Sequence, residues 1–424
     1  MSSKIKSIHA RQIVDCKCRP MVEVDVVTED GALGRGCAPT GSSVGKFESF
    51  VLRDNNPAEY NGLSVHHAVD NVNQIIAPAL IGKDVHNQKE IDQIMIDLDG
   101  TSDKRKLGGN AIYSTSIAVL RAAAKAENLP LYNYLANGPI KTVPVPSFNI
   151  INGGHYENLT QPFNEFIIMP YGASTIYEAV EMGIRTFQEL EKVITRYLGH
   201  KPSVAPSYGY VSPSEDPEEN LKLIAQAIDA CGYTGKIGFA FDCASSEMYD
   251  KDSNTYLLKG KRVAAEELID YAKSLTENYP FVFIEDLLDE EDWDSYPKAH
   301  KAITRTVLLG DDFIVTNIER LKRAYELQAI DGFILKPNQV GTISEALDTF
   351  RFAKEHQLFA TPSGRSGGVV GDVVMDLAVG LGIPFIKNGA PRSGERIDKL
   401  NFLMRACDLN PGCQLADISS LLKF

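Results

Sequence analysis

The sequence contains no apolar stretch long enough to cross a lipid bilayer, which takes about 20 consecutive residues. The N-terminal residues MSSKIKSIHARQIVD also lack the apolar core of a secretory signal peptide. Low-complexity tracts and solenoid-type repeats are missing as well. We therefore expect a cytoplasmic globular protein that does not bind membranes.

Cysteine pairs are scarce too. The seven cysteines are scattered, and only Cys16 and Cys18 lie close together in the sequence. No second pair at the spacing of a zinc site follows them. We expect all seven to be reduced thiols, as is usual in the cytoplasm.

The chain has fewer positively charged than negatively charged side chains. The chain has 43 Lys and Arg against 56 Asp and Glu, which gives a formal net charge of −13. Such an acidic surface argues against nucleic-acid binding and against anionic membranes. A small anionic substrate stays open, because a local basic or metal-bearing pocket can outweigh the overall charge.

The chain is long enough for two domains. Its 424 residues exceed one compact core, and one of the two domains could be a barrel of about 250 residues. An alternating strand pattern, MVEVDVVTEDG, turns at Asp30-Gly31, and helical patterns follow over residues 65–80 and 111–126. Residues 141–146, with prolines at two positions, indicate a domain junction.

Beyond this junction, short apolar runs recur, and each ends in a polar residue. From Glu285 onward these polar ends recur about every 25 residues, the length of one strand and one helix in a βα unit. The pattern predicts an α/β fold with a parallel barrel, and a doubly wound sheet is the alternative. The runs are 237–242, 281–285, 307–311, 333–336, 358–363 and 384–387, and amphipathic helices are expected over 317–329 and 342–356.

Charged residues end four of these runs: Asp242, Glu285, Asp311 and Lys336. Barrel active sites lie at the C-terminal ends of the strands, so these side chains are expected to converge. Three carboxylates there would repel one another without a counter-cation, and hard oxygen ligands suit Mg²⁺. The alternative is that each acid is only a solvated strand end or a helix cap. Three acids in sequential strands, followed by a lysine, disfavour that alternative.

Lys336 follows the apolar residues Ile334 and Leu335. Burial and a neighbouring cation would both disfavour its ammonium form, and such a lysine can act as a general base. The alternative is a lysine that only neutralises the acid cluster.

The order of three acids and then a lysine resembles that of the enolase family, and the resemblance extends over nearly the whole chain. The matching motifs occur in family-like order and spacing, which makes a chance match untenable. They are VEVD at 22–25, PTGSSVG at 39–45, KLGGNA at 106–111, FNIINGG at 148–154, SSEMY at 245–249, IED at 284–286, GDD at 310–312, LKPNQVGT at 335–342, RSG at 365–367 and IKNGAP at 386–391.

The resemblance implies an N-terminal α+β capping domain over residues 1–138 and an enolase-type β/α (TIM-like) barrel over 139–424, in a homodimer. It implies a carbon–oxygen lyase that uses Mg²⁺, with two ions possible, to abstract the α-proton of a small phosphorylated or phosphonate carboxylate. The default reaction converts 2-phosphoglycerate to phosphoenolpyruvate and water. The implied roles are metal binding by Asp242, Glu285 and Asp311, with Ser43 at a second ion, proton abstraction by Lys336, proton handling by Glu165, and substrate binding by Lys387, Arg365 and Ser366.

The departures from the family pattern fall in the half of the site that expels water. Tyr208 stands where the family has a glutamate that assists departure of the β-hydroxyl, and Gly364 stands in place of a histidine. The family's Ser-His pair corresponds to His155-Tyr156, which removes or shifts a second histidine. We therefore take Tyr208 as a candidate catalytic residue and His155 as a candidate substrate-binding residue. We expect proton abstraction to be retained and water expulsion to be weakened.

Three functions stay open at this stage. The first is a divergent hydratase. The second is a specialised paralogue that performs the same enolate chemistry on another substrate, for example in the manner of carboxyphosphonoenolpyruvate synthase. The third is a non-catalytic binding or structural protein, which the acid cluster and Lys336 disfavour. A metal site at His66 and His67, at a helix start, is also disfavoured.

Overall fold

The N-terminal part of the chain is a small antiparallel sheet packed against helices. In a computed structural model of the protein, which describes residues 3–41 and 44–424, its strands pair in the order β1-β2-β3. Val22, Val24 and Val26 alternate along β2 and are buried against the helices. The elements are β1 (Ile5–Val14), β2 (Pro20–Thr28), β3 (Leu33–Cys37), α1 (His66–Asn71), α2 (Ala77–Leu80), α3 (Gln88–Asp99), α4 (Gly109–Ala126) and α5 (Leu131–Leu135).

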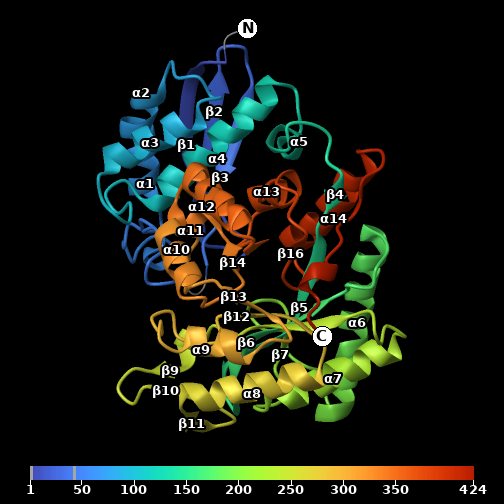
Figure 1. The fold of residues 1–424 in the computed structure, drawn as a ribbon. Helices are drawn as coiled ribbons and strands as arrows, with labels where there is room; N and C mark the ends of the chain where they lie inside the picture. The colour runs from blue at the N-terminus through green and yellow to red at the C-terminus, as the bar shows by residue number, and fades with distance from the viewer. Residues whose placement is uncertain (1–2, 42–43) are drawn as a thin grey trace.

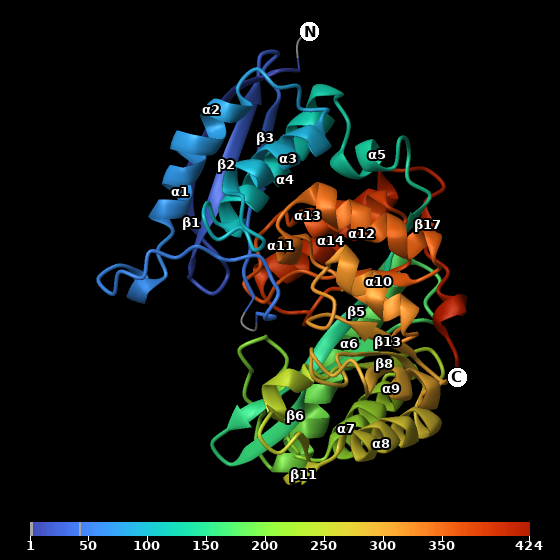
Figure 2. The same cartoon turned by 60° about the vertical axis from the view of Figure 1, so that its left-hand side comes forward.

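Two glycines of β3 let α4 lie directly on the sheet. A Cβ atom at Gly34 would come 2.0 Å from the Ala118 carbonyl oxygen, and one at Gly36 would come 2.0 Å from that of Ser114. Any side chain at these positions would push the helix away. The close contact fixes the sheet, and the loop that follows β3, relative to the helical layer (Figure 2).

The larger part of the chain is a β/α barrel. Its strands follow the order β15-β14-β13-β12-β8-β6-β5-β16, and a parallel bridge between Ser363 and Lys387 closes the ring. β6 pairs antiparallel with β5 and β8, whereas the later strands pair in parallel. The strands are β5 (Val145–Tyr156), β6 (Leu159–Met169), β8 (Gly238–Asp242), β12 (Phe281–Glu285), β13 (Val307–Gly310), β14 (Gly332–Leu335), β15 (Phe359–Pro362) and β16 (Phe385–Lys387).

Helices cover the outside of this barrel, with α7 and α8 at the end far from the N-terminal sheet (Figure 1). They are α6 (Ile176–Leu198), α7 (Pro217–Ala230), α8 (Ala265–Asn278), α9 (Tyr296–Ala302), α10 (Ile318–Glu326), α11 (Pro337–Val340), α12 (Ile343–Glu355), α13 (Val373–Gly380) and α14 (Gly394–Asp408). Short strands complete the fold: β4 (Thr142–Val143), β7 (Tyr210–Val211), β9 (Tyr249–Asp250), β10 (Thr255–Leu258), β11 (Lys261–Val263) and β17 (Gln414–Leu415).

The loop after β3 reaches the mouth of the barrel. Ser49 donates hydrogen bonds from its backbone nitrogen to the Gln339 carbonyl at 2.7 Å and from its hydroxyl to the Asn338 carbonyl at 2.7 Å. Thr40 forms an antiparallel bridge with Gly367. The N-terminal part therefore lies against the C-terminal ends of the barrel strands, where the sequence predicts the active site.

The predicted α/β architecture is confirmed, and the doubly wound alternative is wrong because the ring of strands closes. The predicted helices over residues 111–126 and 342–356 correspond to α4 and α12, each within two residues. The division into domains at residues 138 and 139 stays a prediction.

Candidate active site at the barrel mouth

A cavity of about 240 Å³ opens at the C-terminal ends of the barrel strands. Its size suits a small metabolite rather than a polymer. Most of its lining is polar or charged. Among the residues that the sequence assigns to the site, the lining includes Glu165, Asp242, Asp311, Lys336, Arg365, Ser366 and Lys387.

Three acids stand side by side at this end of the barrel. The strand register places Glu165 of β6 opposite Asp242 of β8, and Asp242 opposite Glu285 of β12. Glu285 is fully buried beneath the cavity lining. Burial and the neighbouring Asp242 carboxylate raise the pKa of Glu285 well above its usual value, although Lys387 opposes the shift.

Lys387, at the end of β16, connects these acids. Its ammonium lies 3.0 Å from an Asp242 oxygen and 3.6 Å from a Glu165 oxygen, and it contacts Glu285 directly. Burial lowers the pKa of Lys387, but Asp242 and Glu285 raise it much more, so the pKa lies well above the usual value. The ammonium is thus held as a permanent positive charge between three carboxylates.

Lys336, directly after β14, forms an ion pair with Asp311, directly after β13. The second Asp311 oxygen accepts a hydrogen bond from the Gln339 amide at 2.8 Å. We predicted that burial and a neighbouring cation would disfavour the ammonium form of Lys336, and for the metal-bound site this stays a prediction. Burial lowers the pKa of Lys336, but the nearby carboxylates, Asp311 foremost and Glu285 with it, together raise the pKa above its usual value. Loss of the Lys336 proton therefore requires that Asp311 takes another cationic partner.

The acids fit a hard divalent cation. Oxygen Oε1 of Glu285 is buried and has no hydrogen-bond partner within the described residues. A buried carboxylate oxygen without a partner is costly, and a metal ion would satisfy it. A different set of three carboxylates is also close enough to share an ion. One oxygen each from Asp286, Asp311 and Asp312 lies within 4.8 Å of the other two.

Asp286 has another explanation within that group. Its two oxygens accept the backbone N–H groups of Asp311 and Asp312 at 2.8 Å and 2.7 Å. This side chain therefore holds the loop that presents Asp311. The predicted ligand Ser43 lies outside the described residues, so its placement stays a prediction.

Arg365 is held by an acid from the N-terminal part. Its two terminal nitrogens donate to the Glu48 oxygens at 2.7 Å and 3.1 Å, and both side chains are buried. Such a fork-to-fork contact fixes the guanidinium plane. Ser366 follows it on the cavity wall, and its carbonyl accepts a contact from the Cys16 thiol at 3.5 Å.

Two predicted residues do not reach the cavity lining. His155 is exposed, and its ring contacts the Thr160 hydroxyl at 3.2 Å. The Tyr208 hydroxyl donates to the Cys16 carbonyl at 3.2 Å, and burial raises the pKa of Tyr208. Neither residue lines the cavity, whereas Tyr156 and Ser207, their chain neighbours, do.

Replacement of Tyr208 by phenylalanine is therefore expected to leave kcat unchanged. The variant should lose about 0.5–1.5 kcal/mol of stability, the net value of one hydrogen bond. Tyr210→Phe, which removes a hydroxyl contact to Glu191 elsewhere in the barrel, is the matched control. Steady-state kinetics and thermal unfolding of both variants test this. A fall in kcat of about 10²-fold in Tyr208→Phe alone would instead mark the tyrosine as the acid.

Several cavity residues were missed by the sequence reasoning. Both polar atoms of the Asn388 side chain are buried without a hydrogen-bond partner in the described chain. The only signal was its place directly after Lys387 in a matched motif. Glu247 lies at the rim, and burial raises its pKa. Arg396 and Lys399 come from α14, a helix that carried no motif in the sequence reasoning.

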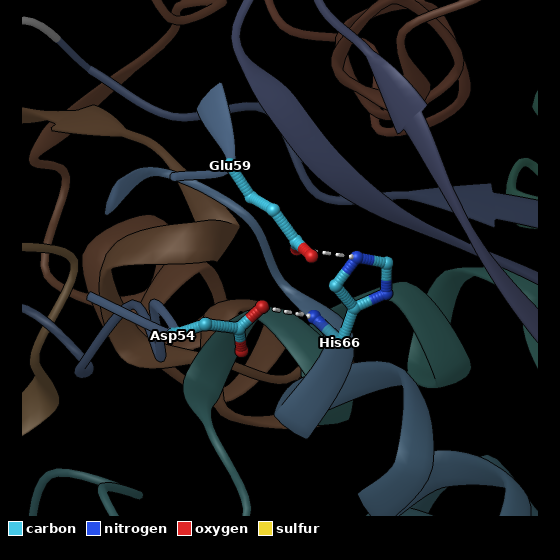
Figure 3. Close-up of side chains that lie close together, drawn as sticks. All are labelled: Asp54, Glu59 and His66. Carbon is cyan, nitrogen blue, oxygen red and sulfur yellow. Dashed lines mark hydrogen bonds and ion pairs between the residues drawn. The ribbon is translucent and has the colours of Figure 1, made fainter. Parts of the chain in front are cut away.

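A second group of potential ligands lies far from this cavity in the sequence, at the start of α1. Figure 3 shows the His66 ring directed toward Glu59 and the His66 backbone nitrogen directed toward Asp54. The ring nitrogen lies 3.2 Å from a Glu59 oxygen, and the backbone nitrogen donates to Asp54 at 2.7 Å. Asp54 also accepts the His67 backbone nitrogen at 2.9 Å. These contacts are those of a helix N-terminus and a surface ion pair, and they require no metal.

Within residues 3–41 and 44–424, no helix has both the length and the apolar character needed to cross a membrane. The closed barrel and the buried acids and lysines at its mouth define a β/α-barrel enzyme. Its cavity has the size of a small molecule, and both acids and cations line it.

Comparison with known proteins agrees with this class. Residues 5–135 match the family model "Enolase, N-terminal domain", and residues 140–413 match "Enolase, C-terminal TIM barrel domain". The proteins named "Enolase" from Methanococcus maripaludis strain S2 and Methanococcus aeolicus strain Nankai-3 are each 42% identical over 405 residues, which is 95% of both chains in each case. The chain belongs to the enolase family.

Family membership makes the protein an enolase-type carbon–oxygen lyase, and the family implies Mg²⁺. The comparisons do not favour a specialised paralogue or a non-catalytic scaffold.

Proposed function

We propose that this lyase interconverts 2-phosphoglycerate with phosphoenolpyruvate and water, with Lys336 as the base. The observation that carries the proposal is the joint placement of Asp311, Lys336 and Arg365 around one small cavity. A carbon acid next to a carboxylate needs a base on one side and positive charge on the other, and these residues provide both. The curated relatives that carry the name Enolase support the same reaction.

Asp242, Glu285 and Asp311 would hold one Mg²⁺, and Ser43 would contribute to a second. When bound, the metal would draw electron density from the substrate carboxylate and so acidify the α-carbon. Lys387 adds a fixed positive charge beside the carboxylate position, since three acids hold it in its protonated form.

The remaining assignments are proposals of the same kind. Arg365, oriented by Glu48, would bind the phosphate together with Ser366. Glu165 would take part in proton handling, and its position is fixed by a 2.9 Å hydrogen bond from the Asn149 amide. The division at residues 138 and 139 and the homodimer rest on the family resemblance. Roles for His155 and Tyr208 gain no support from the cavity geometry.

The decisive experiment measures phosphoenolpyruvate formation from 2-phosphoglycerate before and after removal of divalent metal by a chelator. We expect activity to vanish with the metal and to return with added Mg²⁺. Asp242→Asn should need far more Mg²⁺ for the same rate, because one anionic ligand is lost. Turnover that ignores the chelator, or the absence of any phosphoenolpyruvate at saturating Mg²⁺, would contradict the proposal.

A further inference from the structure

Lys399 fills the space that the glycine at position 364 leaves beside the cavity. An ideal Cβ atom at Gly364 would lie 2.7 Å from the Lys399 ammonium and 3.2 Å from an oxygen of Asp372. Lys399 comes from α14 and is only 4% exposed, and it lines the same cavity as Lys336. The ammonium therefore stands where the family resemblance places a histidine side chain.

This ammonium lacks the partner that a buried charge normally has. In the described part of the chain, no carboxylate oxygen lies within 4.0 Å of the Lys399 nitrogen, and this nitrogen donates no hydrogen bond. Lys387, on the same cavity, contacts three carboxylates. A buried charge without a direct partner is costly, so its retention indicates a ligand that reaches it from the cavity.

The surroundings of Lys399 make its proton easier to release than that of a free lysine. Burial lowers the pKa of Lys399, and the Arg396 guanidinium lowers it further. The Asp372 carboxylate opposes this shift more strongly than Arg396 supports it, and Glu395 and Cys16 oppose it as well, yet the net pKa lies below that of a free lysine. A lowered pKa makes a lysine a stronger acid, which is the direction that general acid catalysis requires.

Arg396 fixes the wall on which Lys399 stands. It donates to the Ser207 carbonyl and lies over the Tyr208 ring at 5.0 Å. Tyr208 is the residue in place of the family's glutamate, and its hydroxyl is occupied by the Cys16 carbonyl. The wall where the family resemblance places the acidic machinery for water expulsion thus presents the two cations Arg396 and Lys399 instead.

We infer that Lys399 is the general acid that protonates the departing β-hydroxyl, an inference that rests on the proposed function. Lys336 first removes the α-proton, and the electron pair of that C–H bond remains as a carbanion delocalised into the adjacent carboxylate. That electron pair then forms the new C=C bond as the Cβ–O bond breaks. The departing oxygen takes a proton from the Lys399 ammonium and leaves as water. Solvent then returns a proton to Lys399 and removes one from Lys336, so the cycle is balanced. In the reverse hydration, neutral Lys399 activates the water.

The test separates proton abstraction from water loss. Lys399→Met and Lys399→Gln should lower kcat for dehydration of 2-phosphoglycerate by about 10²–10⁴-fold, the range for a lost general acid. Exchange of the substrate α-proton with solvent deuterium should persist in both, which also shows that the site is folded. Lys301→Met, at an exposed lysine of α9, is the matched control and should match the wild type.

Lys399→Arg distinguishes acid catalysis from simple charge. Arginine keeps the charge but cannot give up its proton in this pH range. We expect kcat to stay low with KM little changed, and the alkaline limb of the wild-type kcat profile to disappear. If Lys399→Arg instead restores activity and Lys399→Met raises KM, the inference is overturned. Lys399 would then bind the substrate through its charge alone.

Other results would overturn either this inference alone or the proposed function as well. Normal dehydration in Lys399→Met would overturn the inference alone, and a loss confined to Glu247→Gln would transfer the role to that carboxyl group. Absence of both exchange and dehydration in the wild type would overturn the proposed function, and this inference with it.

Discussion

Replacement of Lys336 by methionine is expected to abolish exchange of the α-proton and dehydration together. The loss in kcat should reach about 10²–10⁴-fold or more, because no other group takes over the role of the base. Lys336 stands directly after β14 in contact with Asp311, and it lines the cavity. Mass-spectrometric measurement of deuterium uptake into 2-phosphoglycerate, beside a kinetic assay of phosphoenolpyruvate, gives both rates from one sample.

Loss of both exchange and dehydration distinguishes the role of Lys336 from that of Lys399, because the Lys399 variants should lose dehydration but retain exchange. Lys322→Met, at an exposed lysine of α10 paired with Glu319, is the control for loss of a lysine charge. Because Lys336→Met leaves Asp311 without its ion-pair partner, the variant should be measured well below its melting temperature. Undiminished exchange in a folded Lys336→Met protein would show that another residue is the base.

The strand ends of the later barrel could be predicted within a residue or two, for a physical reason. A barrel strand is buried on both faces, so its sequence is apolar until the chain leaves the barrel. The predicted run 281–285 is β12 itself, and 307–311 extends β13 by one residue. Since the functional side chains stand at those ends, their convergence followed from the same pattern.

The earlier strands could not be predicted in this way. β5 and β6 form a long antiparallel pair, and their sequences mix Asn, Gln and Gly with apolar residues. The polar positions serve the cavity and the loop between the strands, so they obscure the apolar pattern. For this region the family resemblance, not the pattern, indicated the departure from simple βα order.

Side-chain partners within the site depend on contacts that sequence patterns do not encode. Glu48 and Arg365 are 317 positions apart and meet only because the loop after β3 reaches the barrel mouth. The Lys399 ammonium occupies space that a side chain at position 364 would contest. Tyr208 was taken as a candidate catalytic residue from its alignment, and in the structure its hydroxyl donates to the Cys16 carbonyl. Alignment identifies the position of a residue but not the direction of its side chain.

Replacement of Lys387 by methionine is expected to destabilise the metal-free protein by about 3–5 kcal/mol, the cost of breaking a buried ion pair from one side. Lys387 is 6% exposed and contacts Asp242, Glu285 and Glu165, so its removal leaves three neighbouring carboxylates uncompensated. Urea unfolding in the presence of a chelator measures the loss. The same Lys322→Met variant serves as the control, since an exposed pair contributes only about 0–1 kcal/mol.

Added Mg²⁺ should reverse much of this loss, and by more than it stabilises the wild type. The acids that Lys387 contacts include two of the proposed metal ligands, so ammonium and metal compete for the same oxygens in the wild type. Without the lysine, the cation meets a more negative site and binds more tightly. A ligand at 100 times its dissociation constant stabilises a protein by about 2.7 kcal/mol, so a tighter site gives a larger gain in unfolding free energy at equal Mg²⁺.

An equal gain in unfolding free energy in both proteins would show that Lys387 and the metal act at separate places. A Lys387→Met protein as stable as the wild type in chelator would show that the three acids already share protons, and that the lysine is not what balances their charge.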